Sequence, residues 1–284
     1  MIADVRLDKG RRARSALGLI ATAFCSALAA GLLVVLLGYV IIQGWGALNP
    51  AFLTQLPRPV GVTGGGVANG IVGSLIIVGI ATLMAIPVGI LTGLYLAVYG
   101  RGLAAELVRF LAEVLSGLPS IAIGLFAYTI LVQPFSHFSA FSAAFAFTVL
   151  MLPLMIRTSE EAIRGVPTAI REGALALGLP DYEGILHIVL PVARPLIVTG
   201  LLLAVARVTG ETAPLLFTAF GSQFWEINPG NPMAELSLQI FTYAISPYDD
   251  WHRQAWGGAL ILILAVLVLN VGARLALSRG SRKR

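Results

Sequence analysis

The chain has 284 residues, of which 57% are hydrophobic and only 12% are charged. Soluble domains carry about 25% charged residues, so this composition excludes an ordinary globular protein and predicts an all-α integral membrane protein with several spans. The net charge of +5 does not indicate nucleic-acid binding, because the basic residues gather at the chain ends and between apolar runs, where a membrane protein contacts lipid headgroups.

No pattern in the sequence indicates a catalytic site, a metal site or a cofactor. The single cysteine, Cys25, lies inside an apolar run, and the histidines His137, His187 and His252 are widely separated. The run Gly64-Gly65-Gly66 lacks the Gly-Lys-Ser/Thr ending of a phosphate-binding loop, and we interpret it as a flexible approach to a membrane span. If the chain takes part in ATP-driven work, the ATPase is therefore a separate polypeptide.

Hydropathy predicts six membrane-spanning helices, each about long enough for a hydrocarbon layer of roughly 30 Å. The first follows a basic N-terminus, but it lacks a small-residue cleavage site and is too long for a signal peptide, so we expect it to be retained. The predicted spans are Ala16–Ile42, Ile71–Tyr99, Val114–Gln133, Phe138–Ile156, Leu190–Phe220 and Gly257–Leu277.

The distribution of Lys and Arg predicts the orientation of these spans. Most basic residues fall in the two chain ends and in the connections after the second and fourth spans, whereas the opposite side would hold only Arg58 and Arg253. By the positive-inside rule both termini are cytoplasmic, which agrees with an even number of spans. Residues 1–15 and 279–284 are thus predicted to be basic cytoplasmic tails.

The connection between the fourth and fifth spans, residues 157–189, has a helical pattern with a strong break. Gly178-Leu179-Pro180 predicts the end of a helix, because Gly is favoured just after a helix C-terminus and Pro cannot continue the helix. Asp181 is then expected to cap the next helix. The pattern predicts a helix–turn–helix on the cytoplasmic face, and a plain helical linker would show the same signals.

The spacing of residues in this connection resembles the EAA loop of type I ABC-importer permeases. That pattern reads Glu-x-Ala, three residues, Gly, nine residues, Ile-x-Leu-Pro, and Gly173 stands here in place of its first Ala. The resemblance implies a cytoplasmic coupling helix that docks in a groove of an ATPase, with Glu172 near the docking surface and Gly178 at the turn. The matching residues are Glu172, Ala174, Gly178, Ile188, Leu190 and Pro191.

The predicted fifth span contains two charged residues, Arg207 and Glu211. In a continuous helix they share one face, and Arg207 lies roughly 18 Å along the helix from Pro195, near the bilayer midplane. A charge at that depth costs at least a few kcal/mol unless it is paired or hydrated, so we expect a functional role. The structural alternative is an internal salt bridge. Thr209 and Thr212 offer hydroxyl groups nearby, although packing is the more ordinary role of Thr in a span.

The segment around these charges, Ala204–Ala219, is similar to the fifth-span signature of the PstA family of phosphate permease subunits. Leu118-Pro119-Ser120-Ile121 and Pro87-Val88-Gly89 resemble the third-span and second-span motifs of the same family, whereas Val98 stands where many relatives carry an acidic residue. The resemblance covers about residues 65–278. It implies a six-helix permease domain of the type I ABC-importer fold in a bacterial inner membrane.

For function, the resemblance implies a permease subunit that forms half of the pore of an ATP-driven phosphate importer. The implied partners are a second homologous permease subunit, an ATP-binding cassette ATPase dimer, a periplasmic phosphate-binding protein and inorganic phosphate as the substrate. Arg207 suits an oxyanion, because a guanidinium presents a fixed fork of donors and stays charged. In one account, Arg207 then binds Glu211 and the anion in turn as the cavity opens. In the other, Glu211 pairs with the partner permease.

Three other classes of protein are weighed against this interpretation. A membrane enzyme needs a converging base, nucleophile and orienting group, and the spans offer none. A secondary transporter usually shows repeated halves with matching broken helices, which the sequence lacks. A type I permease for another oxyanion, such as sulfate, molybdate or phosphonate, remains the main alternative, because only the segment from Arg207 to Ala219 separates it from a phosphate permease.

Overall fold

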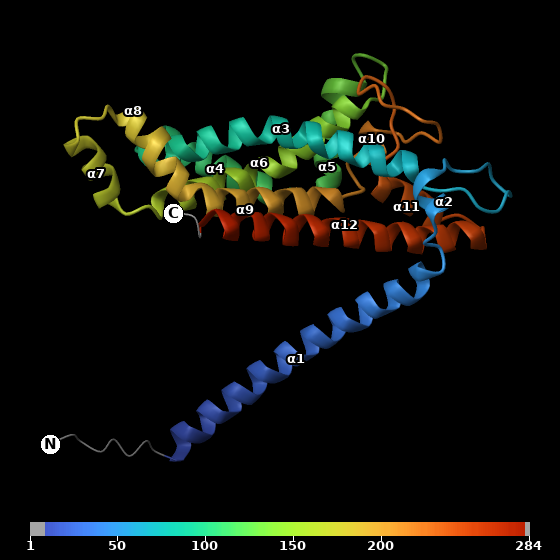
Figure 1. The fold of residues 1–284 in the computed structure, drawn as a ribbon, viewed down its shortest axis with the longest axis horizontal. Coiled ribbons are helices and arrows are strands. Elements are labelled where there is room, and N and C mark those ends of the chain that lie inside the picture. The colour runs from blue at the N-terminus through green and yellow to red at the C-terminus, as the bar shows by residue number, and fades with distance from the viewer. Residues whose placement is uncertain (1–8, 282–284) are drawn as a thin grey trace.

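The computed structural model describes residues 9–281, and this part of the chain is almost entirely helical (Figure 1). Residues 1–8 and 282–284 of the two predicted tails lie outside the described residues. The elements are α1 (Lys9–Trp45), α2 (Pro50–Thr54), α3 (Ala68–Val98), α4 (Leu103–Gly117), α5 (Ser120–Ala127), the π-helical turn η1 (Tyr128–Val132), α6 (Ala140–Arg164), α7 (Thr168–Ala176), α8 (Asp181–Gly184), the π-helical turn η2 (Ile185–Val189), α9 (Leu190–Thr209), α10 (Leu215–Thr218), α11 (Leu236–Ala244) and α12 (Asp249–Ser281).

The long helices other than α1 run side by side in one bundle, with α7 and α8 at one end and α2 and α11 at the other (Figure 1). Five helices of the described chain are long and apolar enough to cross a membrane, and a bent pair of helices brings the number to six. The all-helical architecture is therefore confirmed, and the described helices allow the predicted six spans if the bent pair counts as one.

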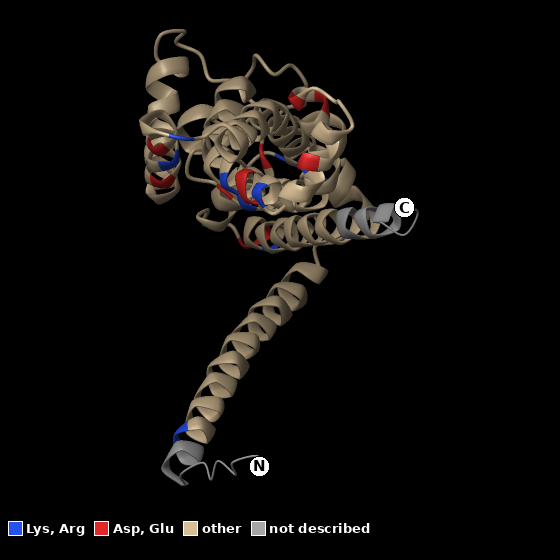
Figure 2. Cartoon of the chain, turned by 90° about the vertical axis from the view of Figure 1, so that its left-hand side faces the viewer, with Lys and Arg blue, Asp and Glu red and all other residues tan. Residues whose placement is uncertain are grey.

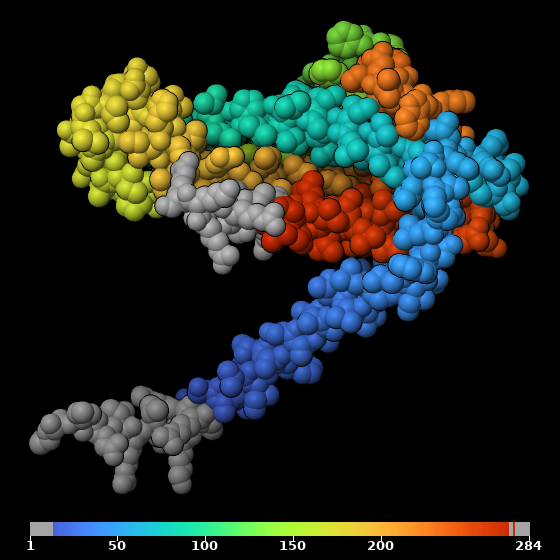
Figure 3. All heavy atoms as spheres, viewed as in Figure 1, coloured from blue at the N-terminus to red at the C-terminus, as the bar shows by residue number. Residues whose placement is uncertain are grey.

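Helix α1 projects away from the bundle and joins it at one end only (Figures 1 and 3). At that junction Tyr39 meets Trp256 of α12 edge to face, with ring centroids 5.2 Å apart. Gly44 allows the close approach, because a methyl group there would lie 2.6 Å from the carbonyl oxygen of Trp256. Most of α1 thus exposes an apolar surface that the rest of this chain does not cover.

The core of the bundle forms where α3 packs along α6. Small residues bring the two backbones together, since a methyl group on Gly93 would lie 2.5 Å from Cβ of Ser159. Ala85, Phe147 and Met151 fill the interface and are almost fully buried. Close packing of small residues is the usual basis of helix association in a membrane, where lipid is as apolar as the side chains.

The predicted third span, Val114–Gln133, is wrong as a single helix. Helix α4 ends at Gly117, and α5 with η1 leaves it at an angle of 106°. Pro119 explains the break, because it lacks an N–H donor and forces Leu118 into an extended conformation, with φ −72° and ψ 139°. After the bend, Gly124 sits against Pro214 so closely that a methyl group would lie 2.5 Å from the Cα of that proline.

The predicted fifth span, Leu190–Phe220, is wrong at both ends. Helix α9 stops at Thr209 with Gly210 as its C-cap, and the chain turns before the short helix α10. On the other side, α8, η2 and α9 follow one another without a break from Asp181, which gives a rod of about 43 Å at 1.5 Å per residue. Helix α11, which the hydropathy did not predict, packs beside α12 at the α2 end (Figure 1).

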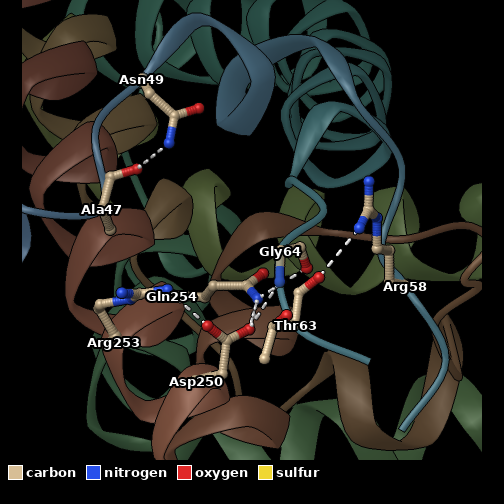
Figure 4. Close-up of polar contacts among 8 residues, drawn as sticks. All are labelled: Ala47, Asn49, Arg58, Thr63, Gly64, Asp250, Arg253 and Gln254. Carbon is tan, nitrogen blue, oxygen red and sulfur yellow. Dashed lines mark hydrogen bonds and ion pairs between the residues drawn. The ribbon is translucent and has the colours of Figure 1, made fainter. Parts of the chain in front are cut away.

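The glycine run Gly64-Gly65-Gly66 is anchored by hydrogen bonds, in contrast to the flexible approach that we expected (Figure 4). The N–H of Gly64 donates to Oδ2 of Asp250 at 3.2 Å, and Nε2 of Gln254 donates to the Gly64 carbonyl at 3.1 Å. Nη1 of Arg58 donates to the Thr63 carbonyl at 3.0 Å. The loop between α2 and α3 is thus tied to the first turns of α12.

Candidate functional site

The turn between α7 and α8 lies where the sequence predicted it. Gly178 has φ +81°, the left-handed conformation that glycine adopts without steric cost. Its N–H donates to the Leu175 carbonyl at 2.9 Å, and the N–H of Leu179 donates to the Ala174 carbonyl at 3.2 Å. These two bonds form a Schellman motif, which ends α7 and satisfies its last carbonyl groups.

The expected cap at Asp181 is wrong. The N-cap of α8 is Pro180, which has no side chain that accepts a hydrogen bond, and Asp181 is the first residue of the helix. Its carboxylate instead accepts three hydrogen bonds from Arg171, at 2.9 to 3.1 Å. It also accepts one from Oη of Tyr99 at 3.2 Å. A bidentate arginine offers the stronger and charged partner, which explains why the carboxylate turns away from the helix N-terminus.

The residues of the EAA-like pattern are divided between surface and interior. Glu172 and Gly173 are exposed, and a methyl group on Gly173 would touch nothing within 4 Å. Ala174 is 2% exposed and packs against Gly184 of α8. Helix α7 also exposes two apolar side chains, Leu175 and Leu177, at the tip of the bundle. The remaining residues of the pattern, Ile188, Leu190 and Pro191, are half-buried where η2 passes into α9.

The predicted charged pair in the fifth span does not form. Arg207 lies in the last turn of α9, whereas Glu211 lies beyond the Gly210 cap, so the two residues do not share a helix face. Within residues 9–281, neither side chain has a hydrogen bond or an ion pair. The main chain of Glu211 is held in place, because its N–H donates to the Val208 carbonyl at 3.0 Å and its carbonyl accepts from Oγ of Ser237 at 3.2 Å.

Arg207 belongs to an exposed stripe along α9. The stripe follows the helical repeat, and the side of the helix next to it, with Gly200, Ala204 and Val208, is buried in the bundle. The bundle of this chain leaves the stripe uncovered. Its members are Val192, Leu196, Leu203 and Arg207.

The two threonines do not converge on Arg207. Oγ1 of Thr209 donates to the Val205 carbonyl at 2.7 Å, within its own helix. Thr209 lines an apolar groove of about 520 Å³ between α3, α9 and α12, away from the exposed stripe. Thr212 is half-buried in the turn after α9, and its carbonyl accepts from the N–H of Leu215 at 3.1 Å. Their hydrogen bonds are thus local contacts with the main chain.

Two buried carboxylates were missed by the sequence reasoning. Glu160 of α6 binds Arg109 and Arg164, with both N–O distances 2.9 Å. Glu235, which caps α11, is fully buried and accepts hydrogen bonds from Oγ of Ser74 at 2.8 Å and from the N–H of Ser237 at 2.7 Å. Burial raises the pKa of Glu235 above its ordinary value of 4.5. Its signal in the sequence was a lone acidic residue in the apolar stretch 232–245.

Charged residues gather at the α7 end of the bundle, which faces the viewer in Figure 2. This end carries the ion pairs of Glu160 and Asp181 and the contact of Arg157 with Glu113 at 3.5 Å. The middle of the bundle is apolar by comparison, so an unpaired arginine on α9 is the more unusual feature. Arg207 on α9 and the exposed end of α7 are connected by the Gly178 turn and then by the unbroken run of α8, η2 and α9.

Comparison with known proteins gives a consistent family. A family model described as "Binding-protein-dependent transport system inner membrane component" matches residues 85–279. The phosphate transport system permease protein PstA of Yersinia pestis is 42% identical over 240 residues, which is 84% of this chain and 81% of that protein. The protein of the same name from Haemophilus influenzae is 44% identical over 236 residues, which is 83% of each chain.

A solved structure agrees with this family in its fold. An inward-facing MetNI methionine ABC transporter matches with a TM-score of 0.58 over 76% of this chain and 95% of that chain, at 18% identity. The fold of the bundle is thus that of a type I ABC-importer permease. The chain is a multi-pass membrane protein that belongs to the binding-protein-dependent transport system inner membrane component family, and within it to the group of permeases named PstA.

Proposed function

We propose that the chain is the permease subunit of an ATP-driven phosphate importer and that it forms half of the translocation pore. The observation that carries this proposal is the identity of 42% and 44%, over more than four fifths of the chain, with two proteins named phosphate transport system permease. The chemistry of α9 supports it, because Arg207 presents an unpaired guanidinium on an uncovered face.

A second homologous permease subunit is the proposed cover of this face. Six spans give one half of a two-fold-like pore, and the stripe of α9 that holds Arg207 is open in the single chain. A guanidinium enclosed between two subunits without a counter-ion would be costly, so the pore favours a passing anion at that point. Glu211 lies outside α9 and leaves the charge of Arg207 uncancelled, which supports direct contact between Arg207 and phosphate.

The α7 end is the proposed cytoplasmic side. The positive-inside rule supports this orientation, since the basic connections after the second and fourth spans lie at that end. Helix α7 would dock in the groove of an ATP-binding cassette ATPase, which a separate dimer of chains provides. The exposed Glu172, Leu175 and Leu177 form a mixed apolar and acidic surface of the kind that a protein groove binds.

The α2 end would then face the periplasm and receive a soluble phosphate-binding protein. The loops of that end lie before α3 and between α10 and α11, and the first of them is fixed to α12 through Asp250 (Figure 4). A rigid rim is a suitable platform for a docking protein, because little order has to be created on binding.

The test is uptake of radiolabelled phosphate into vesicles that hold the intact complex. We expect Arg207→Gln to lower uptake by at least about tenfold, because it removes the charge from the anion path. Arg157→Gln is the control, since that arginine lies near the α7 end and has only a 3.5 Å contact with an exposed Glu113. Co-purification of the ATPase checks assembly.

Competition with sulfate, molybdate and phosphonate decides the substrate. Phosphate uptake that survives a large excess of these anions supports the proposal. If one of them is carried in place of phosphate, the chain is a permease for that oxyanion. Uptake near the wild-type rate in assembled Arg207→Gln complexes would remove Arg207 from the anion path.

A further inference from the structure

Asp181 joins three separate elements at the α7 end. It is the first residue of α8, and its two carboxylate oxygens bind Arg171 of α7 through Nε and Nη2. Oη of Tyr99, the C-cap residue of α3, donates to Oδ2 of the same carboxylate at 3.2 Å. We call this set of Arg171, Asp181 and Tyr99 the Asp181 clamp.

The clamp spans the turn between α7 and α8. Helix α7 is connected to α8 through Leu177–Pro180, which includes the left-handed Gly178. A methyl group on Gly178 would touch nothing within 4 Å, so that side of the turn is open. The bidentate contact of Arg171 with Asp181 closes the angle between the two helices from the other side, together with Ala174 packed on Gly184.

The same carboxylate extends the contact to a helix that is far away in the sequence. Tyr99 ends α3, which packs along α6 and crosses the membrane, whereas α8 continues through η2 into α9 and reaches Arg207. The Tyr99 hydroxyl group donates the hydrogen bond to Asp181, and desolvation together with this bond raises its pKa above the ordinary value of 10.0. The clamp thus connects α7 to both α3 and α9.

Stability of the fold is a weak reason for such a contact. The side chains of Arg171 and Asp181 are 37% and 38% exposed, and ion pairs with that much exposure to solvent contribute little to folding. The contact of Arg171 with Asp181 instead fixes the angle between α7 and α8. A role in transmitting movement from α7 to α8 explains it better than a role in folding.

We propose that the Asp181 clamp positions the coupling helix so that α7, α3 and the α8–α9 rod move as one body when the ATPase moves. This rests on the proposed function, in which α7 docks on an ATPase. Without the clamp, the Gly178 turn would absorb the movement of α7, and ATP would be hydrolysed without a matching change at Arg207.

The test measures ATP hydrolysed per phosphate imported, with the complete complex in proteoliposomes. We expect Asp181→Ala to raise this ratio at least about fivefold while the ATPase still co-purifies, the range of a typical coupling between two sites. Tyr99→Phe should raise it less, because the contact between α7 and α8 remains. The exchanged pair Arg171→Asp with Asp181→Arg should return the ratio toward that of the wild type.

Two matched controls lie on the same short helix. Tyr182→Phe removes a hydroxyl group that bonds only to the adjacent Glu183, and Glu183→Ala removes a carboxylate outside the clamp. Both should keep the wild-type ratio. If Asp181→Ala and Tyr99→Phe also keep it in assembled complexes, the proposal is overturned. If Asp181→Ala does not assemble, the conservative Tyr99→Phe decides, since it keeps every ionic contact.

The same experiment separates this proposal from the proposed function. Wild-type proteoliposomes that import no phosphate would contradict the substrate assignment. The ratio is then measured with the oxyanion that they do import, and it decides on the clamp in the same way. If the wild type imports phosphate and the clamp variants keep an unchanged ratio of ATP hydrolysed to phosphate imported, the proposed function stands. The proposed role of the Asp181 clamp is then contradicted.

Discussion

Three acidic residues at the α7 end, Glu113, Glu160 and Asp181, are paired with arginines, whereas the two charges near the C-terminus of α9 are not. Glu160 holds Arg109 and Arg164, and Asp181 holds Arg171. Within residues 9–281, Arg207 has no ionic partner. The difference indicates two uses of charge in one bundle. In the proposed function, the paired charges set the geometry of the coupling end, and the unpaired Arg207 is free to meet a passing anion.

Glu160→Ala removes the ion pairs with Arg109 and Arg164 and has the largest expected effect on stability. Glu160 is 7% exposed, and its loss leaves Arg109 partly buried with only the carbonyls of Leu96 and Gly100 as partners. We expect a loss of about 3 kcal/mol in the free energy of unfolding, the lower end of the usual cost of removing one partner of a buried pair, because Arg109 is partly exposed. Thermal unfolding of the purified protein in detergent measures it. Glu161→Ala, an exposed neighbour, is the control.

Gly178→Ala and Gly173→Ala test which glycine at the α7 end is required by its backbone conformation. Both positions have space for a methyl group, but only Gly178 has a left-handed backbone, with φ +81°. Alanine at 178 should destabilise the turn by about 1–2 kcal/mol, because left-handed backbone costs that much outside glycine. Alanine at 173 should stabilise α7 by up to about 1 kcal/mol. Hydrogen exchange of the α7 amides reports both effects, and equal changes at the two sites would contradict the assigned turn.

Glu235→Gln tests the third kind of acidic residue, one that is buried with neutral partners only. Its raised pKa means that the folded protein binds the proton more tightly than the unfolded chain. The stabilisation is complete below pH 4.5, the ordinary pKa, and is lost as the pH rises through the raised value. The thermal midpoint of the wild type should therefore fall with rising pH in that window, and the variant should fall less. Equal slopes for the two proteins would show that Glu235 keeps its charge in the fold.

Hydropathy predicted the long spans well, because each must bury its own backbone bonds in an apolar layer. The Gly178 turn was also predictable, since one glycine and one proline carry the whole signal. The break at Leu118-Pro119 and the end of α9 at Thr209 were missed, although Pro119, Gly210 and Pro214 are local signals. Apolar composition continues through both breaks, and a window average does not detect a change of direction.

The side-chain contacts were less predictable than the helices. Asp181 was expected to cap a helix because that role depends on neighbours in the sequence, whereas its partner Arg171 lies across a turn. Tyr99 is 82 positions away from it. Arg207 and Glu211 were expected to pair because their spacing of four residues was read as helix. The spacing was correct, but the helix ends between them.

The most direct test of the central claim is a double-mutant cycle on phosphate uptake, with Arg207→Gln, Glu211→Gln and both together. If Arg207 is free to meet the anion, the double variant should be as inactive as Arg207→Gln alone, because no partner is released by removing Glu211. If the two residues form a salt bridge in the working complex, removing both should restore uptake well above the level of Arg207→Gln. That rescue would contradict the unpaired arginine on which the account depends.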